Sequence, residues 1–206
     1  MSGNEGQELE VKFYLSDLSA FQEGLEISGG HVLQARLHEV NLRFDTPDSE
    51  LTRTYQVLRL RQDKIARLTY KGPGEIVGGV RSRREIEFSV GDFSEARSFL
   101  EALGYQVSLM YEKFRATYEL GGVEITLDEM PYGTFAELEG PDAASIQTLA
   151  GKLGVQWEAR IVESYTFLFE RLRGVLDFTF RDLSFENFAG IEVTPEALGV
   201  RPADQK

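Results

Sequence analysis

Charged side chains occupy alternate positions in the segment Glu8-Leu9-Glu10-Val11-Lys12. Side chains two positions apart in an extended chain share one face, so the two carboxylates and the ammonium group point one way and the apolar side chains point the other. Carboxylates can bind a cation and an ammonium group can bind an anion. A single strand of this kind is commonly a solvated sheet edge, so its meaning depends on the rest of the chain.

The same alternation recurs along the chain, and solubility alone does not require it. We therefore expect the charged faces of these strands to meet one another. The recurring segments are Leu58-Arg59-Leu60-Arg61, Leu68-Thr69-Tyr70-Lys71, Arg83-Arg84-Glu85-Ile86-Glu87, Lys113-Phe114-Arg115 and Phe135-Ala136-Glu137-Leu138-Glu139.

Strand parity predicts which residues share the charged face. Burying so many charges costs several kcal/mol per ion unless each charge is paired, hydrated or bound to a ligand. The predicted inward acids are Glu8, Glu10, Glu85, Glu87, Asp128, Glu137 and Glu139. The predicted inward bases are Lys12, Arg59, Arg61, Lys71, Arg83, Lys113 and Arg115.

This mixture of charges favours a phosphate ligand together with a divalent cation. Arginine matches phosphate oxygens with two donors and lysine supplies a point charge, so the bases suit a polyanion with several phosphates. Carboxylates in the same cavity would repel that polyanion unless a divalent cation lay between them. An all-oxygen site selects Mg2+ or Mn2+ over zinc.

Alternation and Gly, Pro and Asp breaks predict eight strands, and apolar residues three and four apart predict four helices. The apolar strand faces would then look outward toward the helices. We therefore predict an α+β fold, an eight-stranded antiparallel β-barrel tunnel with a charged lumen and helices packed outside. The strands are expected at about 8–15, 33–44, 55–62, 65–71, 80–89, 110–118, 123–129 and 134–140. The helices are expected behind Ser16 with Leu18, Phe21 and Leu25, behind Asp92 as far as Gly104, through Ile146, Leu149 and Leu153 to Gly154, and through Ile161, Tyr165, Leu168 and Leu172.

Composition limits the class of protein. A chain of 206 residues, 42% hydrophobic and 27% charged, is typical of one globular domain. The net charge of −12 argues against a nucleic-acid or anionic-membrane partner, and the absence of cysteine excludes disulfides and thiolate sites. With neither a long apolar run nor a secretion signal at its start, the chain is expected to be cytoplasmic.

The end of the chain differs from the rest. We expect residues 1–173 to form the tunnel domain and residues 174–206 to form an extension that is packed on the barrel or partly flexible. Phe178, Phe180, Phe185 and Phe188 argue against disorder as far as about residue 193. An arm packed on the barrel is favoured over a lid across one tunnel mouth.

The ordered set of motifs resembles the CYTH superfamily, the triphosphate tunnel metalloenzymes. Members of that superfamily include inorganic triphosphatases, thiamine triphosphatases, class IV adenylyl cyclases and fungal RNA triphosphatases. The resemblance covers residues of about 8 to 172. It is carried by Glu8-x-Glu10-x-Lys12, Phe44-Asp45-Thr46, Leu58-Arg59-Leu60-Arg61, Leu68-Thr69-Tyr70-Lys71-Gly72-Pro73, Arg83-x-Glu85-x-Glu87, Lys113-x-Arg115, Leu127-Asp128-Glu129-x-Pro131 and Phe135-x-Glu137-x-Glu139.

The resemblance implies a tunnel that binds a triphosphate in its middle and presents a water in line with it. It implies that Glu8, Glu10 and Glu139 are the main ligands of Mg2+ or Mn2+, with Glu137, Glu85, Glu87 and Asp128 nearby. The phosphate cradle would consist of Lys12, Arg59, Arg61, Lys71, Arg83, Lys113 and Arg115. Glu8, Glu10, Lys12 and Glu137 are the residues that we expect to act in catalysis.

Three functions remain open from the sequence. A metal-dependent triphosphatase acting on tripolyphosphate or on an organic triphosphate such as thiamine triphosphate is the leading hypothesis. An adenylyl cyclase that releases pyrophosphate is the alternative. Cyclases of this type carry a His-Phe pair just before the first charged strand, whereas Met1 to Gln7 contains neither residue. A non-catalytic polyphosphate or nucleotide sensor ranks last, because it could dispense with the carboxylates. The expected partner is a small-molecule triphosphate, and the oligomeric state is open.

Several residues outside these motifs are expected to be ordinary surface. The histidines have no second metal ligand at a suitable spacing. This group comprises Arg36, Arg67, Arg84, Glu124, His31 and His38.

Overall fold

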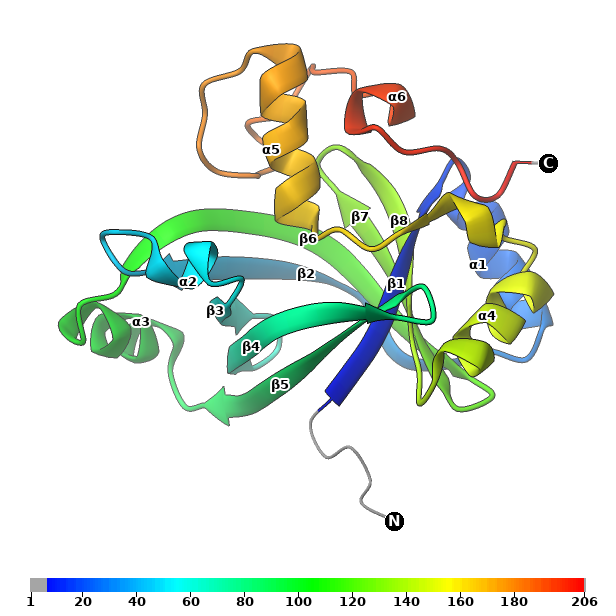
Figure 1. Ribbon diagram of the computed structural model, residues 1–206, viewed down its shortest axis with the longest axis horizontal. Helices are drawn as coiled ribbons and strands as arrows, with labels where there is room; N and C mark the ends of the chain where they lie inside the picture. Colours follow the sequence, from blue (N-terminus) through cyan, green and yellow to red (C-terminus); the bar gives the residue numbers. More distant parts are fainter. Residues whose placement is uncertain (1–6, 206) are drawn as a thin grey trace.

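The chain folds into one antiparallel sheet that closes on itself (Figure 1). The computed structural model describes residues 7–205, with side chains from residue 9 onward. Within that range the strands are β1 (Gln7–Leu15), β2 (His31–Asp45), β3 (Val57–Gln62), β4 (Ala66–Val77), β5 (Val80–Val90), β6 (Gln106–Leu120), β7 (Val123–Met130), β8 (Gly133–Glu139) and β9 (Arg160–Ile161).

The pairing of β5 with β1 closes the ring. The strands follow the order β5-β4-β3-β2-β6-β7-β8-β1. The short strand β9 pairs with Lys12 and Phe13 of β1, on the edge opposite β8. At the closure Glu8 lies opposite Arg83, and on the other side of β1 Lys12 lies opposite Glu137. The predicted fold class, an eight-stranded antiparallel ring with helices outside, is therefore confirmed.

All the described α-helices except α2 (Glu50–Arg53) begin at a residue whose side chain caps the first turn, in agreement with most of the sequence signals. The helices are α1 (Leu18–Ile27), α2, α3 (Phe93–Ala102), α4 (Ala143–Lys152), α5 (Tyr165–Leu176) and α6 (Pro195–Leu198), with a 3-10 turn at Trp157–Ala159. Asp92 and Ser164 each accept the backbone N–H three residues ahead, which satisfies one of the free donors of the first turn. The first helix is capped by Asp17 instead of Ser16. Within the described residues, no helix is long and apolar enough to span a membrane.

The predicted start of the fourth helix was wrong. Ile161 belongs to β9, where it pairs with Lys12, and its buried side chain packs beneath α5. The helix begins only at Tyr165, after Ser164 has capped it. Helical spacing from Ile161 to Tyr165 was therefore a coincidence of two buried positions in different elements.

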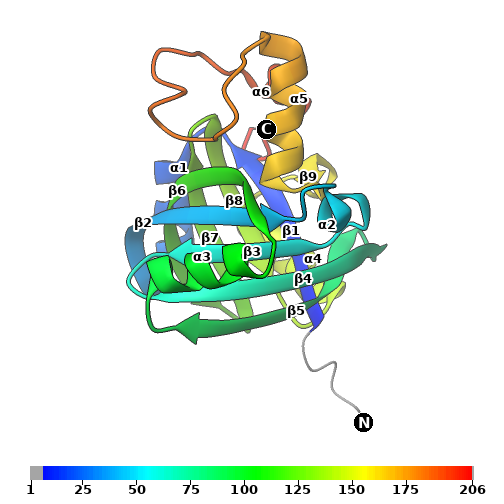
Figure 2. The same ribbon diagram turned by 90° about the vertical axis from the view of Figure 1, so that its left-hand side faces the viewer.

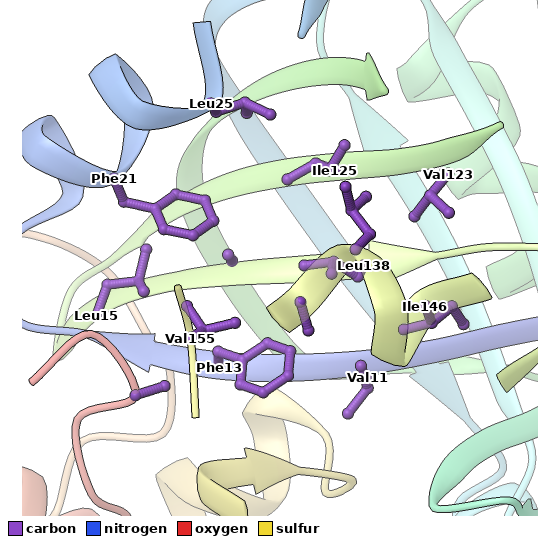
Figure 3. Close-up of a cluster of buried hydrophobic side chains, with 14 of the residues drawn as sticks. Val11, Phe13, Leu15, Phe21, Leu25, Val123, Ile125, Leu138, Ile146 and Val155 are labelled. Atoms are coloured by element: carbon purple, nitrogen blue, oxygen red, sulfur yellow. The ribbon is translucent and has the colours of Figure 1, made fainter. Parts of the chain in front are cut away.

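Much of the outward surface of the strands is apolar and is covered by helices, although Ile86 and Phe88 on β5 remain exposed. Figure 3 shows Phe21 of α1 and Ile146 of α4 lying over Val11 and Phe13 of β1 and Leu138 of β8. On another side of the ring, α3 lies across β3 (Figure 2). There Leu100 packs with Leu42, Phe44 and Leu60. The two-residue period of the strands thus places apolar side chains outside and leaves the charged ones inside.

Helix α5 covers one end of the ring, and α6 lies beside it (Figures 1 and 2). At that end the inner face changes from charged to aromatic, because Tyr14 of β1 and Phe135 of β8 continue the inward parity of Lys12 and Glu137. Both aromatic side chains pack in one buried cluster with α5 residues such as Leu168.

The rest of the chain is fastened to this end. Rings of the segment after α5 stack on the helix: the centroids of Phe169 and Phe178 lie 5.4 Å apart. Near the C-terminus, Ala203 donates its N–H to the carbonyl of Tyr14, and the Asp204 carboxylate accepts the N–H of Ser16. Helix α5 itself runs without a break across the boundary that we expected between residues 173 and 174.

We expect α5 to unfold together with the ring because its buried face is part of the same structure. Leu172→Ala should lower the free energy of unfolding by about 2–5 kcal/mol, the usual cost of emptying a fully buried leucine site. Urea unfolding followed by circular dichroism measures this change. Val175→Ala on the exposed side of α5 is the matched control and should change it by less than about 0.5 kcal/mol. Equal effects of both substitutions would contradict this packing.

Candidate active site

A cavity of about 290 Å³ lies inside the ring, and most of the predicted site residues line it. All the predicted bases do so: Lys12, Arg59, Arg61, Lys71, Arg83, Lys113 and Arg115. Of the predicted acids, those that line it are Glu10, Glu85, Glu87, Glu137 and Glu139. The structure therefore brings together side chains from strands that are far apart in the sequence.

Two predicted site residues are placed differently. Asp128 faces inward but is fully buried behind the cavity wall, where its carboxylate accepts hydrogen bonds from Lys113 at 3.0 Å and Tyr165 at 2.8 Å, and also from Arg115. Glu8 lies opposite Arg83 in the ladder, but its side chain lies outside the described part of the structure.

The assignment of strand faces from the sequence was incomplete for two charged residues, Glu124 and Arg67. Glu124 is exposed, as we expected, but it also lines the cavity, because β7 alternates inward through Glu124, Thr126 and Asp128. Arg67, also expected at the surface, is half-buried, with Nε 3.7 Å from a carboxylate oxygen of Glu87. The surface expectation was wrong for Arg67, and extending the alternation of the neighbouring motifs would have placed both residues on the inner face. The expected surface positions of Arg36, Arg84, His31 and His38 are exposed.

The second strand of the ring also carries inward residues that the sequence analysis missed. Glu39, Asn41 and Arg43 follow the same two-residue alternation on β2, and Arg43 lines the cavity beside Tyr111 of β6. Asn41 is fully buried, and neither atom of its amide group has a hydrogen-bond partner. Such a group is costly to leave unsatisfied, so a water or ligand group reaching it would relieve the cost.

The first turn of α5 contributes another part of the wall. Ser164, Tyr165 and Thr166 line the cavity, and the Arg43 guanidinium donates to the Thr166 hydroxyl at 2.8 Å. From its helical spacing we predicted Tyr165 only to be a residue of the apolar core. No signal in the local sequence shows that this turn reaches the interior of the ring.

The bases are held by carboxylates. Lys12 Nζ lies 3.0 Å from Glu137 and 3.6 Å from Glu10, while the Arg83 guanidinium donates to Glu10 at 2.9 Å. Lys71 Nζ lies 2.7 Å from a carboxylate oxygen of Glu85. These pairs explain how the ring tolerates so many buried charges without a ligand.

Spare donors nevertheless remain in the cradle. Arg59 and Arg61 stand on the same face of β3 and both line the cavity, and the buried Nε of each has no hydrogen-bond partner. Because guanidinium groups match the oxygens of phosphate, these donors suit an anionic ligand.

Neighbouring charges determine the ionisation of Glu137 and Lys12. Burial opposes ionisation of Glu137, but the positive charges of Lys12 and Arg115 outweigh it and hold the pKa of that carboxyl well below its usual range. Burial likewise lowers the pKa of Lys12, yet Glu10 and Glu137 raise it above the ordinary value. Both groups are therefore charged around neutral pH.

Carboxylates of three neighbouring strands form a row that suits a hard cation. Glu10 of β1 lies in register with Glu139 of β8, which lies in register with Glu124 of β7. Over residues 9–205, no three acidic or histidine side chains gather closely enough to form a complete ion site. Mg2+ in phosphate-binding enzymes is usually held by one or two carboxylates together with substrate phosphates, and the row offers that donor set.

Comparison with known proteins gives a family match and similar structures. A model of the CYTH domain matches residues 6–153. Adenylate cyclase CyaB from Aeromonas hydrophila is 30% identical over 174 residues, which cover 80% of this chain and 89% of that protein. The X-ray structure of a putative adenylate cyclase from Vibrio parahaemolyticus is 25% identical with a TM-score of 0.71, and the match covers 79% of this chain and 97% of that one.

A third similarity is more distant. A putative adenylyl cyclase from Hippeastrum, described as having a dominant triphosphatase activity, is 20% identical with a TM-score of 0.59. The match covers 79% of this chain and 95% of that one and shows a shared fold. The family match ends at residue 153, before α5 begins at Tyr165.

The ion pairs of Glu137 predict how stability depends on pH. Since the folded-state pKa of Glu137 is depressed, its stabilising effect is present above the unfolded value of about 4.3 and is lost as the pH falls through the folded pKa. Glu137→Gln should therefore lower the melting temperature at pH 7, and its difference from the wild type should shrink as the pH falls below about 4.3. Thermal melts of both proteins between about pH 3 and 7 measure this. A difference that stays constant over the range would contradict the assignment.

Proposed function

Because the chain belongs to the CYTH domain family, we propose that it is a divalent-metal-dependent enzyme that hydrolyses tripolyphosphate or an organic triphosphate bound in the cavity. The observation that carries this proposal is the composition of the cavity wall. Apart from Val57, every side chain lining it is charged or bears a hydroxyl group, and the two tyrosines, Tyr111 and Tyr165, also present aromatic rings. Such a wall recognises phosphates and offers little apolar surface to an organic group.

The size of the cavity supports the same reading. Its volume of about 290 Å³ is at the lower end of the range for small-molecule sites, roughly 300–1,000 Å³. A phosphate chain can be enclosed there, whereas an organic group would extend toward the opening. We expect a free small molecule as the substrate, without a nucleic-acid or membrane partner, since the chain carries a net charge of −12.

In the proposed reaction the protein aligns the phosphate chain and neutralises charge. Arg59 and Arg61 donate to phosphate oxygens, and Lys12, held cationic by Glu10 and Glu137, stabilises the negative charge that develops as water attacks. The water oxygen bonds to the terminal phosphorus while the bond from that phosphorus to the bridging oxygen breaks. The attacking water releases a proton to the solvent, and orthophosphate and the shortened chain leave.

The acidic residues have two proposed roles. One or two carboxylates of the group Glu8, Glu10, Glu124 and Glu139 would hold Mg2+ or Mn2+ together with substrate phosphates, and the cation would neutralise charge on the phosphate oxygens. Glu137 stays ionised and is engaged by Lys12 and Arg115, so we assign it the orientation of these cations. Asp128 holds Lys113 and Arg115 from behind the wall in the same way, while Glu85 and Glu87 hold Lys71 and Arg61.

Adenylyl cyclase activity is the second candidate, because the relative that is 30% identical bears that name. Cyclisation would use the same cradle, but the ribose hydroxyl would attack the α-phosphate and pyrophosphate would leave. The predominantly charged and polar side chains of the wall favour hydrolysis, as does the sequence from Met1 to Gln7, which contains neither His nor Phe.

A product assay separates the two reactions. Tripolyphosphate, thiamine triphosphate and ATP are incubated in parallel with Mg2+ or Mn2+, and orthophosphate, pyrophosphate and cyclic AMP are quantified. We expect orthophosphate from at least one substrate, and removal of the metal with EDTA should abolish its release. Pyrophosphate and cyclic AMP in equal amounts from ATP would establish the cyclase instead.

The cradle can be tested with a matched pair of arginines. Arg59→Ala should raise KM for the triphosphate about ten- to a hundredfold, the range expected when a hydrogen bond to a charged group worth about 1.5–3 kcal/mol is lost. Arg84→Ala, an exposed position outside the cavity lining, should leave KM within about twofold. Steady-state kinetics give the comparison and thermal melts confirm folding. An unchanged KM for Arg59→Ala would remove it from the cradle.

A further inference from the structure

Tyr165, the first residue of α5, contacts charged residues of three different strands. Lys12 Nζ of β1 and Lys113 Nζ of β6 lie over its ring, 5.3 Å and 5.5 Å from the ring centroid. Its hydroxyl donates to the Asp128 carboxylate of β7 at 2.8 Å. Both lysines and Tyr165 itself line the cavity.

Neighbouring residues hold the aromatic ring of Tyr165 in place. Phe135 meets it edge-on with centroids 5.1 Å apart, and the Tyr132 hydroxyl donates to the Tyr165 carbonyl at 2.8 Å. The helix is capped by Ser164 and anchored by the buried Leu168. Tyr165 therefore has little freedom to move when a ligand enters.

An aromatic ring in this position has an electrostatic effect on the lysines. The negative face of the ring attracts an ammonium group, most strongly where water is excluded. Lys12 and Lys113 repel each other, and each has a carboxylate partner at 3.0 Å, Glu137 and Asp128 respectively. The Tyr165 hydroxyl and the Lys113 ammonium group both donate to Asp128, so the same carboxylate holds the tyrosine side chain and the lysine.

The hydroxyl stays protonated and so remains a donor. Burial and the nearby Asp128 carboxylate raise the pKa of Tyr165 well above its usual range. Phenylalanine at this position would keep the ring over the lysines but would lose the link to Asp128. Leucine would lose both.

We propose that Tyr165 is a positioning residue of the phosphate site, whose ring holds the ammonium groups of Lys12 and Lys113 in place and whose hydroxyl fixes that ring to Asp128. This role rests on the proposed function, in which the two lysines bind phosphates. It also means that the first turn of α5 contributes to the site together with the strands.

The test measures affinity for tripolyphosphate by isothermal titration, with EDTA present to prevent turnover and at fixed ionic strength. Measurements are made well below each variant's melting temperature, so that a loss of stability alone leaves the Kd unchanged. Tyr165→Leu should raise the Kd about tenfold and Tyr165→Phe about threefold, since an aromatic–cation contact and a hydrogen bond contribute at this level.

Two variants serve as matched controls. Phe169→Leu removes a fully buried ring from the same helix and cluster, without a contact to either lysine. Tyr118→Phe removes another tyrosine hydroxyl that donates to a carboxylate, that of Glu26 at 3.0 Å. Tyr118 lies on the outer face of the closed sheet. Both should leave the Kd within about twofold, even where the melting temperature falls.

The outcomes distinguish this role from the function on which it rests. A Kd for Tyr165→Leu within twofold of the wild type overturns the role of Tyr165, as does an equal loss of affinity in Phe169→Leu. If Tyr165→Leu does not fold, an unchanged Kd for Tyr165→Phe overturns the link through Asp128. Failure of the wild type itself to bind tripolyphosphate overturns the proposed function.

Discussion

The structure depends on one constraint, the burial of many charges of both signs inside a closed ring of strands. Ions removed from water must be paired, hydrated or bound to a ligand. The ring meets this requirement by placing acids and bases opposite or beside one another, as Lys12 and Glu137 are in the ladder between β1 and β8. Closure matters because it brings Arg83 of β5 next to Glu10 of β1, which are 73 residues apart in the chain.

Stability has to come from the other face of the same strands. Many of the outward side chains are apolar, and α1, α3 and α4 cover the buried ones, so the hydrophobic core lies between the ring and the helices. The charged interior therefore does not need to supply the apolar contacts that stabilise the fold. It can carry unsatisfied groups, such as the amide of Asn41 and the Nε atoms of Arg59 and Arg61, that a ligand would complete.

Helix α5 links these two parts. Its buried face belongs to an apolar cluster that also contains Tyr14 and Phe135 of the ring, while its first turn lies in the charged cavity. One short element therefore closes an end of the ring and supplies polar groups to the site. The packing of Leu168 and Leu172 fixes the place of Tyr165 beside the lysines, so core packing and the geometry of the site are coupled.

The sequence by itself determined the inside and outside of most strands, since a two-residue period is a local property of an extended chain. That was enough to predict the closed fold and the bases that line the cavity, from Lys12 to Arg115. Where parity was uncertain it failed. Arg67 was placed at the surface, Glu124 was not assigned to the cavity, and Arg43 on the irregular strand β2 was missed. The tertiary structure alone decided that Asp128 lies behind the cavity wall and that Tyr165 reaches the lysines. These positions depend on how α5 packs across the end of the ring, and no spacing within a single segment records a contact between elements that meet only after the ring has closed.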